Sequence, residues 1–314
     1  MTHPLTTRSV HTHQNHFGWS RDTPVAMTVA PGERVEIDVI DGGGGQISPD
    51  STTKTIADLD FDTLLPLTGP IAVDDAEPGD TLKVTLLDLS PSGWGWSAII
   101  PGFGILAEEF TEPALHIWRY EKTGRVPAAF GAARVPLKPF PGTLGVAPSQ
   151  PGIHSALPPR NVGGNLDTRD IAAGCSVYFP IEVEGALFSV GDTHAAQGDG
   201  ELAGSAIESP MKLTVQLDVI KEQTLGGPWF ITPGPVTRHL DTRGYYVTSG
   251  VGPDLMNNAQ EAVRRMIDLI SGRYGLSAEQ VYMLCSVCAD LRISELVNKP
   301  NWVVSLYFPR VVLE

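Results

Sequence analysis

The sequence predicts a mainly β fold, in which a β-rich body carries an α+β portion near the C-terminus. Three observations point to this class. Apolar and polar residues alternate in several segments between residues 24 and 220, as in strands with one buried face. Glycine (33) and proline (26) are abundant, as turns between many short strands require. From about residue 253, apolar residues recur at helical spacing instead, which indicates helices.

Several segments of the body are individually predicted to be strands. Residues 35–39 and 82–86 each place apolar side chains at every second position, so one face of each strand is expected to be buried. Residues 176–192 are expected to form two strands around Glu184 and Gly185, and residues 209–221 are expected to contain another. The segment 140–165 is so rich in proline and glycine that it is predicted to be a long loop.

The end of the chain is predicted to be helical before it returns to a strand. Residues 259–270 have apolar side chains at helical spacing, and Gly272 is the expected end of that helix. Ser277 and Gln280 have the spacing of a capping box, which marks the start of a second helix. The segment 301–313 is again expected to be a strand.

This pattern divides the chain into three expected parts. Residues 1–15, which include His11 and His13, are expected to be a flexible N-terminal segment. Residues 16–250 are expected to be the β-rich catalytic body, and residues 251–314 an α+β portion packed on it.

Composition and charge exclude several classes of partner. The chain has 314 residues, of which 42% are hydrophobic and 18% charged, as in a globular protein. Its formal net charge is −14, so neither nucleic acid nor a membrane is an expected partner, because phosphates attract clustered Lys and Arg. The sequence shows no run of about 20 apolar residues and no apolar signal core. With three cysteines, a cytoplasmic location is expected.

The segment "SVGDTHAAQGDGE", residues 189–201, concentrates acids, a histidine and three glycines. On a strand, Asp192 and His194 point to the same side, where a carboxylate and an imidazole suit a divalent metal. A hydrogen-bonded turn would explain the same residues without a metal. Glu201 and Glu208 flank a run of small residues, and a buried carboxyl group with a raised pKa suits a general base.

Other candidate residues are more ambiguous. Phe17 and Trp19 can anchor His16 to the body, and the glycine-flanked Asn165 and Asp167 can either contact a ligand or fix a loop. Cys175 could be a nucleophile, although a buried cysteine at a strand is the preferred interpretation. Two further residue pairs are expected to pack in the interior: Cys285 with Cys288 in a helix, and Trp94 with Trp96, which could also line a pocket.

The segments "HFGWSRDTP", "DGGGGQISPDST", "PGIHSALPPRNVGGNLDTRD", "GALFSVGDTHAAQGDGELAGSAIESP" and "SVCADLRISELVNKPNWVVSLYFP" closely resemble the acetamidase/formamidase family. The resemblance extends from residue 16 to about residue 308. It implies hydrolysis of a small aliphatic amide, such as formamide or acetamide, to a carboxylate and ammonia. It also implies that the β-rich body is β-sandwich-like with an added α+β portion. A divalent metal (zinc preferred, calcium as the alternative) and a homo-oligomer, a dimer or larger, are implied as well. The family pattern carries over to His16, Asp41, Asn165, Asp167, Asp192, His194, Gln197, Asp199, Glu201 and Glu208.

From this resemblance we expect nine of these residues to have particular roles. Metal ligands are expected to be His16, Asp41, Asp192 and His194, and catalytic residues Glu208, Glu201, Asn165, Gln197 and Asp167. Glu208 is the preferred general base, with Glu201 as the alternative, and Asn165 or Gln197 is expected to stabilise the oxyanion. Two alternatives remain open: an amidase with Cys175 as nucleophile, and a metal-binding or ligand-binding β protein without turnover.

Overall fold

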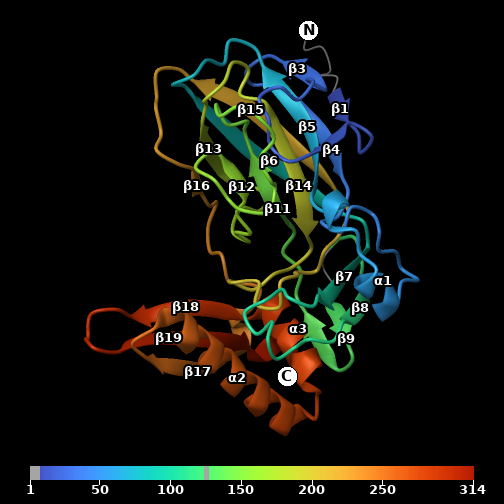
Figure 1. Cartoon of the computed structure of the whole chain (residues 1–314), viewed down its shortest axis with the longest axis vertical. Coiled ribbons are helices and arrows are strands. Elements are labelled where there is room, and N and C mark those ends of the chain that lie inside the picture. The colour runs from blue at the N-terminus through green and yellow to red at the C-terminus, as the bar shows by residue number, and fades with distance from the viewer. Residues whose placement is uncertain (1–7, 124–126) are drawn as a thin grey trace.

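The structure is a computed structural model that describes residues 8–123 and 127–314. Its larger part is a β-sandwich, which confirms the predicted fold class (Figure 1). The first sheet has the order β1-β4-β15-β6-β13-β16 and consists of β1 (Arg8–Val10), β4 (Arg34–Val39), β15 (Met211–Ile220), β6 (Thr81–Pro91), β13 (Ser176–Pro180) and β16 (Trp229–Ile231).

The second sheet has the order β12-β11-β14-β5-β2, with β3 paired to β5. It consists of β12 (Gly163–Asn165), β11 (Phe140–Gly145), β14 (Phe188–His194), β5 (Pro66–Val73), β2 (Asn15–Phe17) and β3 (Met27–Val29). The two sheets share one hydrophobic core. Val35, Ile37 and Val39 of β4 point into it, as their alternation in the sequence predicts.

The N-terminal residues 8–10 belong to the first sheet. β1 pairs in parallel with β4, and Val10, opposite Ile37, is buried in the sandwich core. Of the segment 1–15 that we expected to be flexible, residues 1–7 lie outside the described residues.

The expectation of a loop over residues 140–165 was wrong at both ends of the segment. β11 lies inside the second sheet between β12 and β14, and all six of its residues are buried. Its glycines are explained by close packing rather than by turns. A Cβ on Gly145 would lie 2.7 Å from the carbonyl oxygen of Val162, so only glycine lets these backbones approach.

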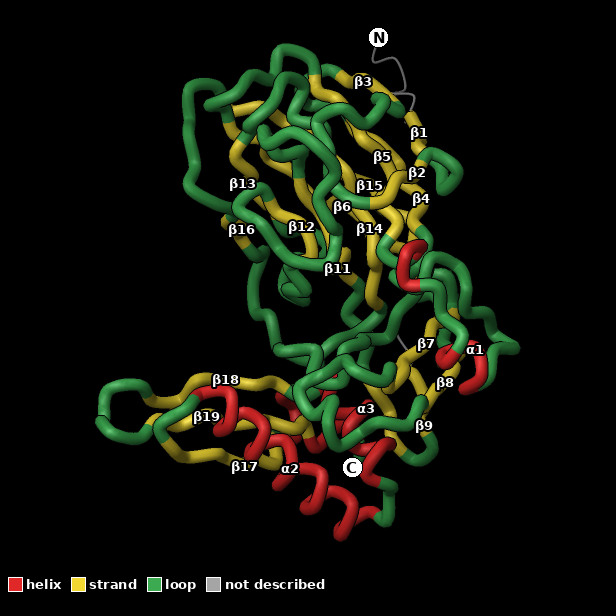
Figure 2. The backbone as a smooth tube through the Cα atoms, viewed as in Figure 1, coloured by secondary structure: helices red, strands yellow, loops and turns green. Residues whose placement is uncertain are grey.

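The smaller part of the molecule is α+β and lies below the sandwich in Figures 1 and 2. A three-stranded sheet of order β17-β19-β18 packs against the long helix α2. The elements of this part are β17 (Tyr245–Gly252), β18 (Asp290–Glu295), β19 (Trp302–Pro309), α2 (Leu255–Tyr274), α3 (Ala278–Cys288) and the one-turn helix η3 (Arg310–Val312). Beside them lie the hairpins β7 (Trp94–Ile99) with β8 (Ala114–Arg119) and β9 (Ala128–Phe130) with β10 (Ala133–Val135). Three short helices lie in connecting segments: α1 (Thr53–Ala57), η1 (Phe61–Thr63) and η2 (Asp241–Arg243).

Local signals define the ends of both long helices. Ser277 caps α3 and forms the predicted capping box with Gln280. The predicted end of α2 at Gly272 was wrong, because Gly275 ends the helix in the left-handed conformation, which glycine adopts without steric cost. In the part of the chain that the structure describes, no helix is both long enough and apolar enough to cross a membrane.

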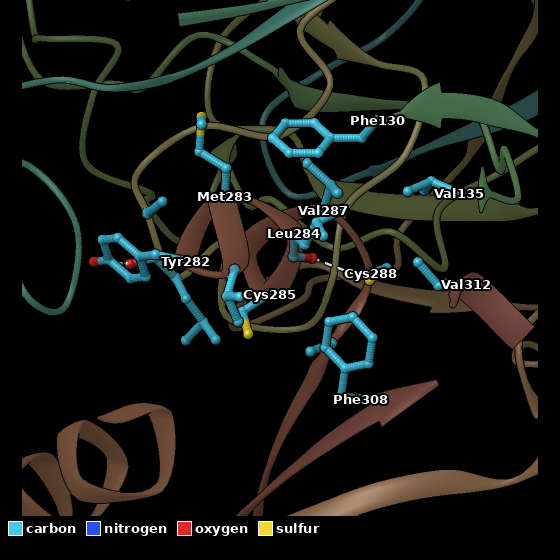
Figure 3. Close-up of a cluster of buried hydrophobic side chains, with 14 of the residues drawn as sticks. Phe130, Val135, Tyr282, Met283, Leu284, Cys285, Val287, Cys288, Phe308 and Val312 are labelled. Atoms are coloured by element: carbon cyan, nitrogen blue, oxygen red, sulfur yellow. Dashed lines mark hydrogen bonds between the residues drawn. The ribbon is translucent and has the colours of Figure 1, made fainter. Parts of the chain in front are cut away.

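A second hydrophobic core fills the smaller part, and α3 runs through it (Figure 3). Figure 3 shows Phe130 and Phe308 on opposite sides of α3, with Cys285 and Cys288 between them. Both cysteines are buried, as expected for a helix in a core. The second core combines the C-terminal elements with two earlier segments, residues 99–135 and 195–207. The C-terminal portion therefore shares its core with the middle of the chain.

Candidate functional site

The candidate site lies at the end of β14, where the two cores meet. Phe188 and Val190 of this strand pack in the sandwich core, whereas Ala195 and Ala196, directly after it, pack in the second core. His194 is the last residue of β14 and is completely buried. Its position between two packed cores holds the imidazole ring in a fixed place.

Carboxylates surround His194 on both ring nitrogens. Nε2 lies 3.3 Å from Oδ1 of Asp192 and 3.1 Å from Oε2 of Glu208. Nδ1 lies 3.8 Å from Oδ1 of Asp167. The expected meeting of Asp192 and His194 on one side of a strand is therefore observed.

Two groups of side chains around His194 have the spacing of metal ligands. Asp192, His194 and Glu208 form one group, and Asp167, His194 and Glu201 form the other. In each group the candidate ligand atoms lie within 4.8 Å of one another. The histidine is common to both, so one imidazole can bind a metal on one nitrogen while a carboxylate accepts a hydrogen bond from the other.

Three of these acids have a backbone conformation that is rare for residues with a side chain. Asp167, Asp192 and Glu201 have φ values of 44°, 50° and 43°, in the left-handed region. Such conformations cost about 1–3 kcal/mol each and concentrate at active sites. The chain therefore tolerates strain at the points where these carboxylates converge.

Hydrogen bonds from neighbouring segments orient the site. The hydroxyl of Thr143 on β11 donates to Oδ1 of Asn165 at 2.6 Å and is 3.4 Å from Oδ2 of Asp192. Nε2 of Gln197 donates to the backbone oxygen of Asp167 at 2.8 Å. Sequence reasoning missed Thr143, because it lies in the segment that was interpreted as a loop.

Asp41 approaches the site from the loop after β4. Its Oδ1 accepts hydrogen bonds from Nε1 of Trp96 at 3.0 Å and from the backbone of Gly43 at 2.9 Å. The backbone of Trp96 also exchanges two hydrogen bonds with that of Glu208. Trp96 therefore links two acids of the site.

Two glycines leave room for the acids. A Cβ on Gly42 would lie 2.2 Å from Oδ1 of Asp192, and a Cβ on Gly142 would lie 2.6 Å from Oδ1 of Asp167 and 2.7 Å from Cε1 of His194. Contacts below 3.0 Å essentially never occur for real Cβ atoms. The site therefore requires glycine at both positions.

Burial and mutual repulsion shift the pKa values of the carboxyl groups. Burial raises the pKa of Glu208 to about 7 and, together with the charge of Asp192, raises the pKa of Asp167 to about 7. Burial also raises the pKa of Glu201 well above its usual value. Burial opposes the charged form of His194, but the carboxylates of Glu208 and Asp192 outweigh it and raise its pKa.

Several buried polar atoms of the site have no hydrogen-bond partner among the described residues. They are Oδ1 of Asp167, Nδ1 of His194 and Oε1 of Gln197. Buried polar atoms are nearly always paired, and exceptions call for a specific explanation such as an ion. Carboxylate oxygens and an imidazole nitrogen are suitable ligands for a divalent cation, so the residues present fit a metal.

The acids form one side of a cavity of about 510 Å³. Asp167, Asp192, Glu201 and Glu208 line it together with Asn165, and the remaining wall is mainly apolar. Trp96 lines the cavity and belongs to a buried apolar cluster. Trp94, two residues earlier, packs against the same cluster but does not line the cavity.

Two of the residues that the family pattern places at the site, His16 and Asp199, bind other partners. Both ring nitrogens of His16 have partners: Nδ1 donates to the backbone oxygen of Gly18 at 2.8 Å, and Nε2 is 2.9 Å from the hydroxyl of Ser189. His16 therefore belongs to neither metal-ligand group. Asp199 is half-exposed and lies 3.4 Å from Nε of Arg169.

Cys175, the alternative nucleophile, is completely buried in the sandwich core and does not line the cavity. Burial raises the pKa of its thiol to about 11. Because the thiolate is the nucleophilic form, this environment does not favour nucleophilic attack.

Comparison with known proteins yields relatives over nearly the whole chain. The family model described as "Acetamidase/Formamidase family" matches residues 4–157 and 152–314. The formamidase of Methylophilus methylotrophus is 27% identical over 96% of this chain and 90% of its own length. The acetamidase of Mycolicibacterium smegmatis is 28% identical over 86% of this chain and 84% of its own. The solved structure of a gamma lactamase from Delftia acidovorans superposes with a TM-score of 0.88 at 26% identity, over 95% of this chain and 89% of that one.

Proposed function

This chain belongs to the acetamidase/formamidase family and is an amidohydrolase that acts on small linear amides, and from this premise we propose that its hydrolysis depends on a divalent metal bound at His194. The observation that carries the proposal is the excess of buried acid around a single imidazole. Asp192 and Glu208 approach one nitrogen of His194, and Asp167 approaches the other. Ionised carboxylates without a counter-charge are costly in an interior, and a cation would balance them.

The preferred ligands are Asp192, Glu208 and Nε2 of His194. Asp167 beside Nδ1 would then accept a hydrogen bond from that nitrogen and orient the ring, as carboxylates commonly do for metal-binding histidines. We propose zinc rather than calcium, because calcium takes oxygen ligands and zinc accepts imidazole. When bound, such a metal polarises an amide carbonyl and lowers the pKa of water.

We assign the role of general base to Glu201. Glu208, the base preferred from the sequence, lies 3.1 Å from the histidine nitrogen that would bind the metal, so its carboxylate is better placed as a ligand. Glu201 lines the cavity, and burial raises the pKa of its carboxyl group well above the usual value, which makes its carboxylate a stronger base. Glu201 takes a proton from the water that attacks the carbonyl carbon. It then delivers this proton to the amide nitrogen as the C–N bond breaks, and ammonia leaves.

Asn165 is the proposed donor to the oxyanion. It lines the cavity, and its Oδ1 accepts a hydrogen bond from Thr143, which leaves the Nδ2 hydrogens to donate. Donors fixed before the reaction stabilise the developing negative charge without reorganisation. Gln197, the other candidate, donates to the backbone of Asp167 instead and is better explained as a residue that positions that acid.

The test measures metal content and activity on the same samples. Ammonia release from formamide and acetamide is followed before chelation, after chelation and after single metals are added back, while mass spectrometry counts the bound metal. We expect about one zinc per chain, loss of activity on its removal, and recovery with zinc but not with calcium. Full activity in a preparation shown to contain no metal would exclude the proposal.

The same measurement separates the two alternatives. A binding protein without turnover would bind the metal but release no ammonia from any amide. A cysteine amidase would keep its activity after chelation and lose it on thiol alkylation.

A cyclic amide is a second candidate substrate. The gamma lactamase from Delftia acidovorans superposes closely on this chain, and the cavity has room for a ring. Ring opening of 2-pyrrolidinone, followed by chromatography of the amino acid that it releases, tests this substrate beside the linear amides.

We also propose that the chain forms a homo-oligomer. Trp229, Phe230 and Ile231 form the edge strand β16, and all three are exposed. Exposed apolar patches commonly mark protein interfaces. Light scattering after size-exclusion chromatography should give a mass of at least two chains, and the mass of one chain would exclude the proposal.

A further inference from the structure

The walls of the cavity that contains the acids are far more apolar than a substrate of the size of acetamide requires. Besides the carboxylates, the lining includes many apolar side chains: Leu59, Phe61, Leu64, Leu65, Trp96, Ile100, Phe103, Ile153, Ala156 and Leu157. These residues come from three separate stretches of the chain, 59–65, 96–103 and 153–157. An apolar cavity with a few polar groups at one end is typical of a site that binds a ligand with an apolar body.

The size of the cavity leads to the same conclusion. Its volume is about 510 Å³, which lies within the range of about 300–1,000 Å³ of sites for much larger ligands. Acetamide has four non-hydrogen atoms, comparable to four water molecules at ~30 Å³ each. Acetamide would therefore leave most of the cavity to water and would contact few of its apolar walls.

Several of the apolar lining residues are exposed to solvent. Phe61, which is 51% exposed, stacks with Phe103 with their ring centroids 5.6 Å apart and their planes within 9° of parallel. Ile153 and Leu157, which also line the cavity, are 78% and 53% exposed. Solvent-exposed apolar side chains around a cavity gain favourable burial when a ligand covers them.

The cavity disfavours a negatively charged substrate. Asp62 lines it in addition to Asp167, Asp192, Glu201 and Glu208. Among the described residues 8–123 and 127–314, no Lys or Arg lines the cavity. A carboxylate on the substrate would face these acids and lose its hydration without gaining a partner.

We propose that the preferred substrate is an uncharged primary amide whose acyl group is an apolar chain or ring of about four to eight carbons. This inference rests on the proposed function of the same site. The amide lies at the carboxylate end, beside Asn165 and Glu201. The acyl group extends between the Phe61–Phe103 pair and the side chains of Ile153 and Leu157.

A substrate series tests the proposal. Values of kcat/KM are measured by ammonia release for acetamide, butanamide, hexanamide and benzamide. Each fully buried methylene can raise kcat/KM about fourfold, which corresponds to ~0.8 kcal/mol. From acetamide to hexanamide we expect a rise between about tenfold and about 250-fold, as four methylenes become buried. Adipamic acid, as long as hexanamide but ending in a carboxylate, should react at least about tenfold more slowly than hexanamide because of the acids in the cavity.

The outcomes separate this inference from the proposed function. If acetamide is hydrolysed and kcat/KM falls with chain length, the inference is wrong and the metal-dependent hydrolysis stands. If no amide in the series releases ammonia from the zinc-loaded protein, the proposed function is wrong and the inference falls with it.

A pair of matched variants tests whether Leu157 contacts the acyl group of the substrate. Leu157→Ser should lower the ratio of kcat/KM for hexanamide to that for acetamide by at least about threefold, because the chain loses apolar contacts. Leu296→Ser is the control: Leu296 is similarly exposed, at 49% against 53% for Leu157, and does not line the cavity. Equal ratios in the two variants would show that Leu157 does not contact the acyl group and would overturn the proposed position of that group.

Light scattering on the same samples provides a second readout. If the molecular mass fell with Leu157→Ser alone, Leu157 would belong to a contact between copies of the chain, and this result would also overturn the proposal.

Discussion

Arg169 and Asp290 lie 121 residues apart in the sequence and form a buried ion pair. Nη2 of Arg169 donates to Oδ2 of Asp290 at 2.8 Å, and the two side chains are 2% and 0% exposed. Arg169 belongs to the loop that carries Asp167, whereas Asp290 begins β18 in the smaller part. The pair therefore joins the loop of the sandwich that carries Asp167 to the C-terminal sheet.

Loss of the arginine should destabilise the whole protein. Arg169→Met leaves Asp290 buried with the half-exposed Arg292 as its ionic partner, and breaking a buried pair costs about 3–5 kcal/mol. We expect a fall of that size in the free energy of unfolding, measured by urea denaturation. Lys212→Met, which removes an exposed pair with Glu36, should cost less than about 1 kcal/mol. Similar losses in the two variants would show that burial does not strengthen the Arg169–Asp290 pair.

Adding one methyl group at Gly142 should disable the site. The new Cβ of Gly142→Ala would collide with Asp167 and His194, so the acids must move, and a displacement of about 1 Å can cost 10²-fold in rate. We expect kcat/KM for acetamide to fall at least about tenfold, with the circular dichroism spectrum retained. Gly272→Ala is the control. It lies in α2 with nothing within 4 Å of its new Cβ, and it should raise the stability by about 0.5–1 kcal/mol. Wild-type activity in Gly142→Ala would contradict the tight packing.

Metal binding should depend on Asp192 and not on His16. Asp192→Asn removes a proposed ligand charge and should reduce zinc to well below one per chain, measured by mass spectrometry after dialysis. His16→Ala breaks a hydrogen bond with Ser189, so it should retain zinc and lose only about 0.5–1.5 kcal/mol of stability. If His16→Ala also lost its zinc, the imidazole would be a ligand, as expected from the sequence.

The general base should be separable from the metal ligands. Glu201→Gln keeps the shape of the side chain but cannot accept the proton, and loss of such a group costs about 10²–10⁴-fold in rate. We expect kcat to fall by that factor while zinc stays bound. Asp199→Asn, two residues away and directed toward Arg169, should keep kcat within about threefold, since this residue lies outside the acid cluster. If Glu201→Gln retained kcat, the base would be another group.

Native Cys175 should not react with thiol reagents. It is buried, and its pKa of about 11 leaves almost no thiolate at neutral pH. Iodoacetamide should label the folded protein at less than about a tenth of the rate of the unfolded protein, with no loss of amidase activity. Rapid labelling that parallels inactivation would restore the cysteine mechanism.

The sequence by itself determined the local elements of this protein. The alternation in residues 35–39 and 82–86 predicts strands with one buried face, and the structure buries their apolar positions. The pair Ser277 and Gln280 marks a helix start correctly. These signals depend on periodicity and on hydrogen bonds between residues close in sequence, so they can be read without the fold. The proximity of Asp192 and His194 can also be predicted without the fold, because two residues that are two apart on one strand point to the same side.

Only the tertiary structure decided how the site is completed. Asp167 reaches His194 through the pairing of β11 with β12 and β14, a long-range arrangement that no local pattern encodes. The glycines of β11 are typical of a loop in the sequence, yet the acids pack against one of them. His16 has the residue type of a ligand, but register places it opposite Leu67, where Ser189 and Gly18 engage its nitrogens. Residue type and spacing therefore indicate which groups can do chemistry, and sheet register decides which of them meet.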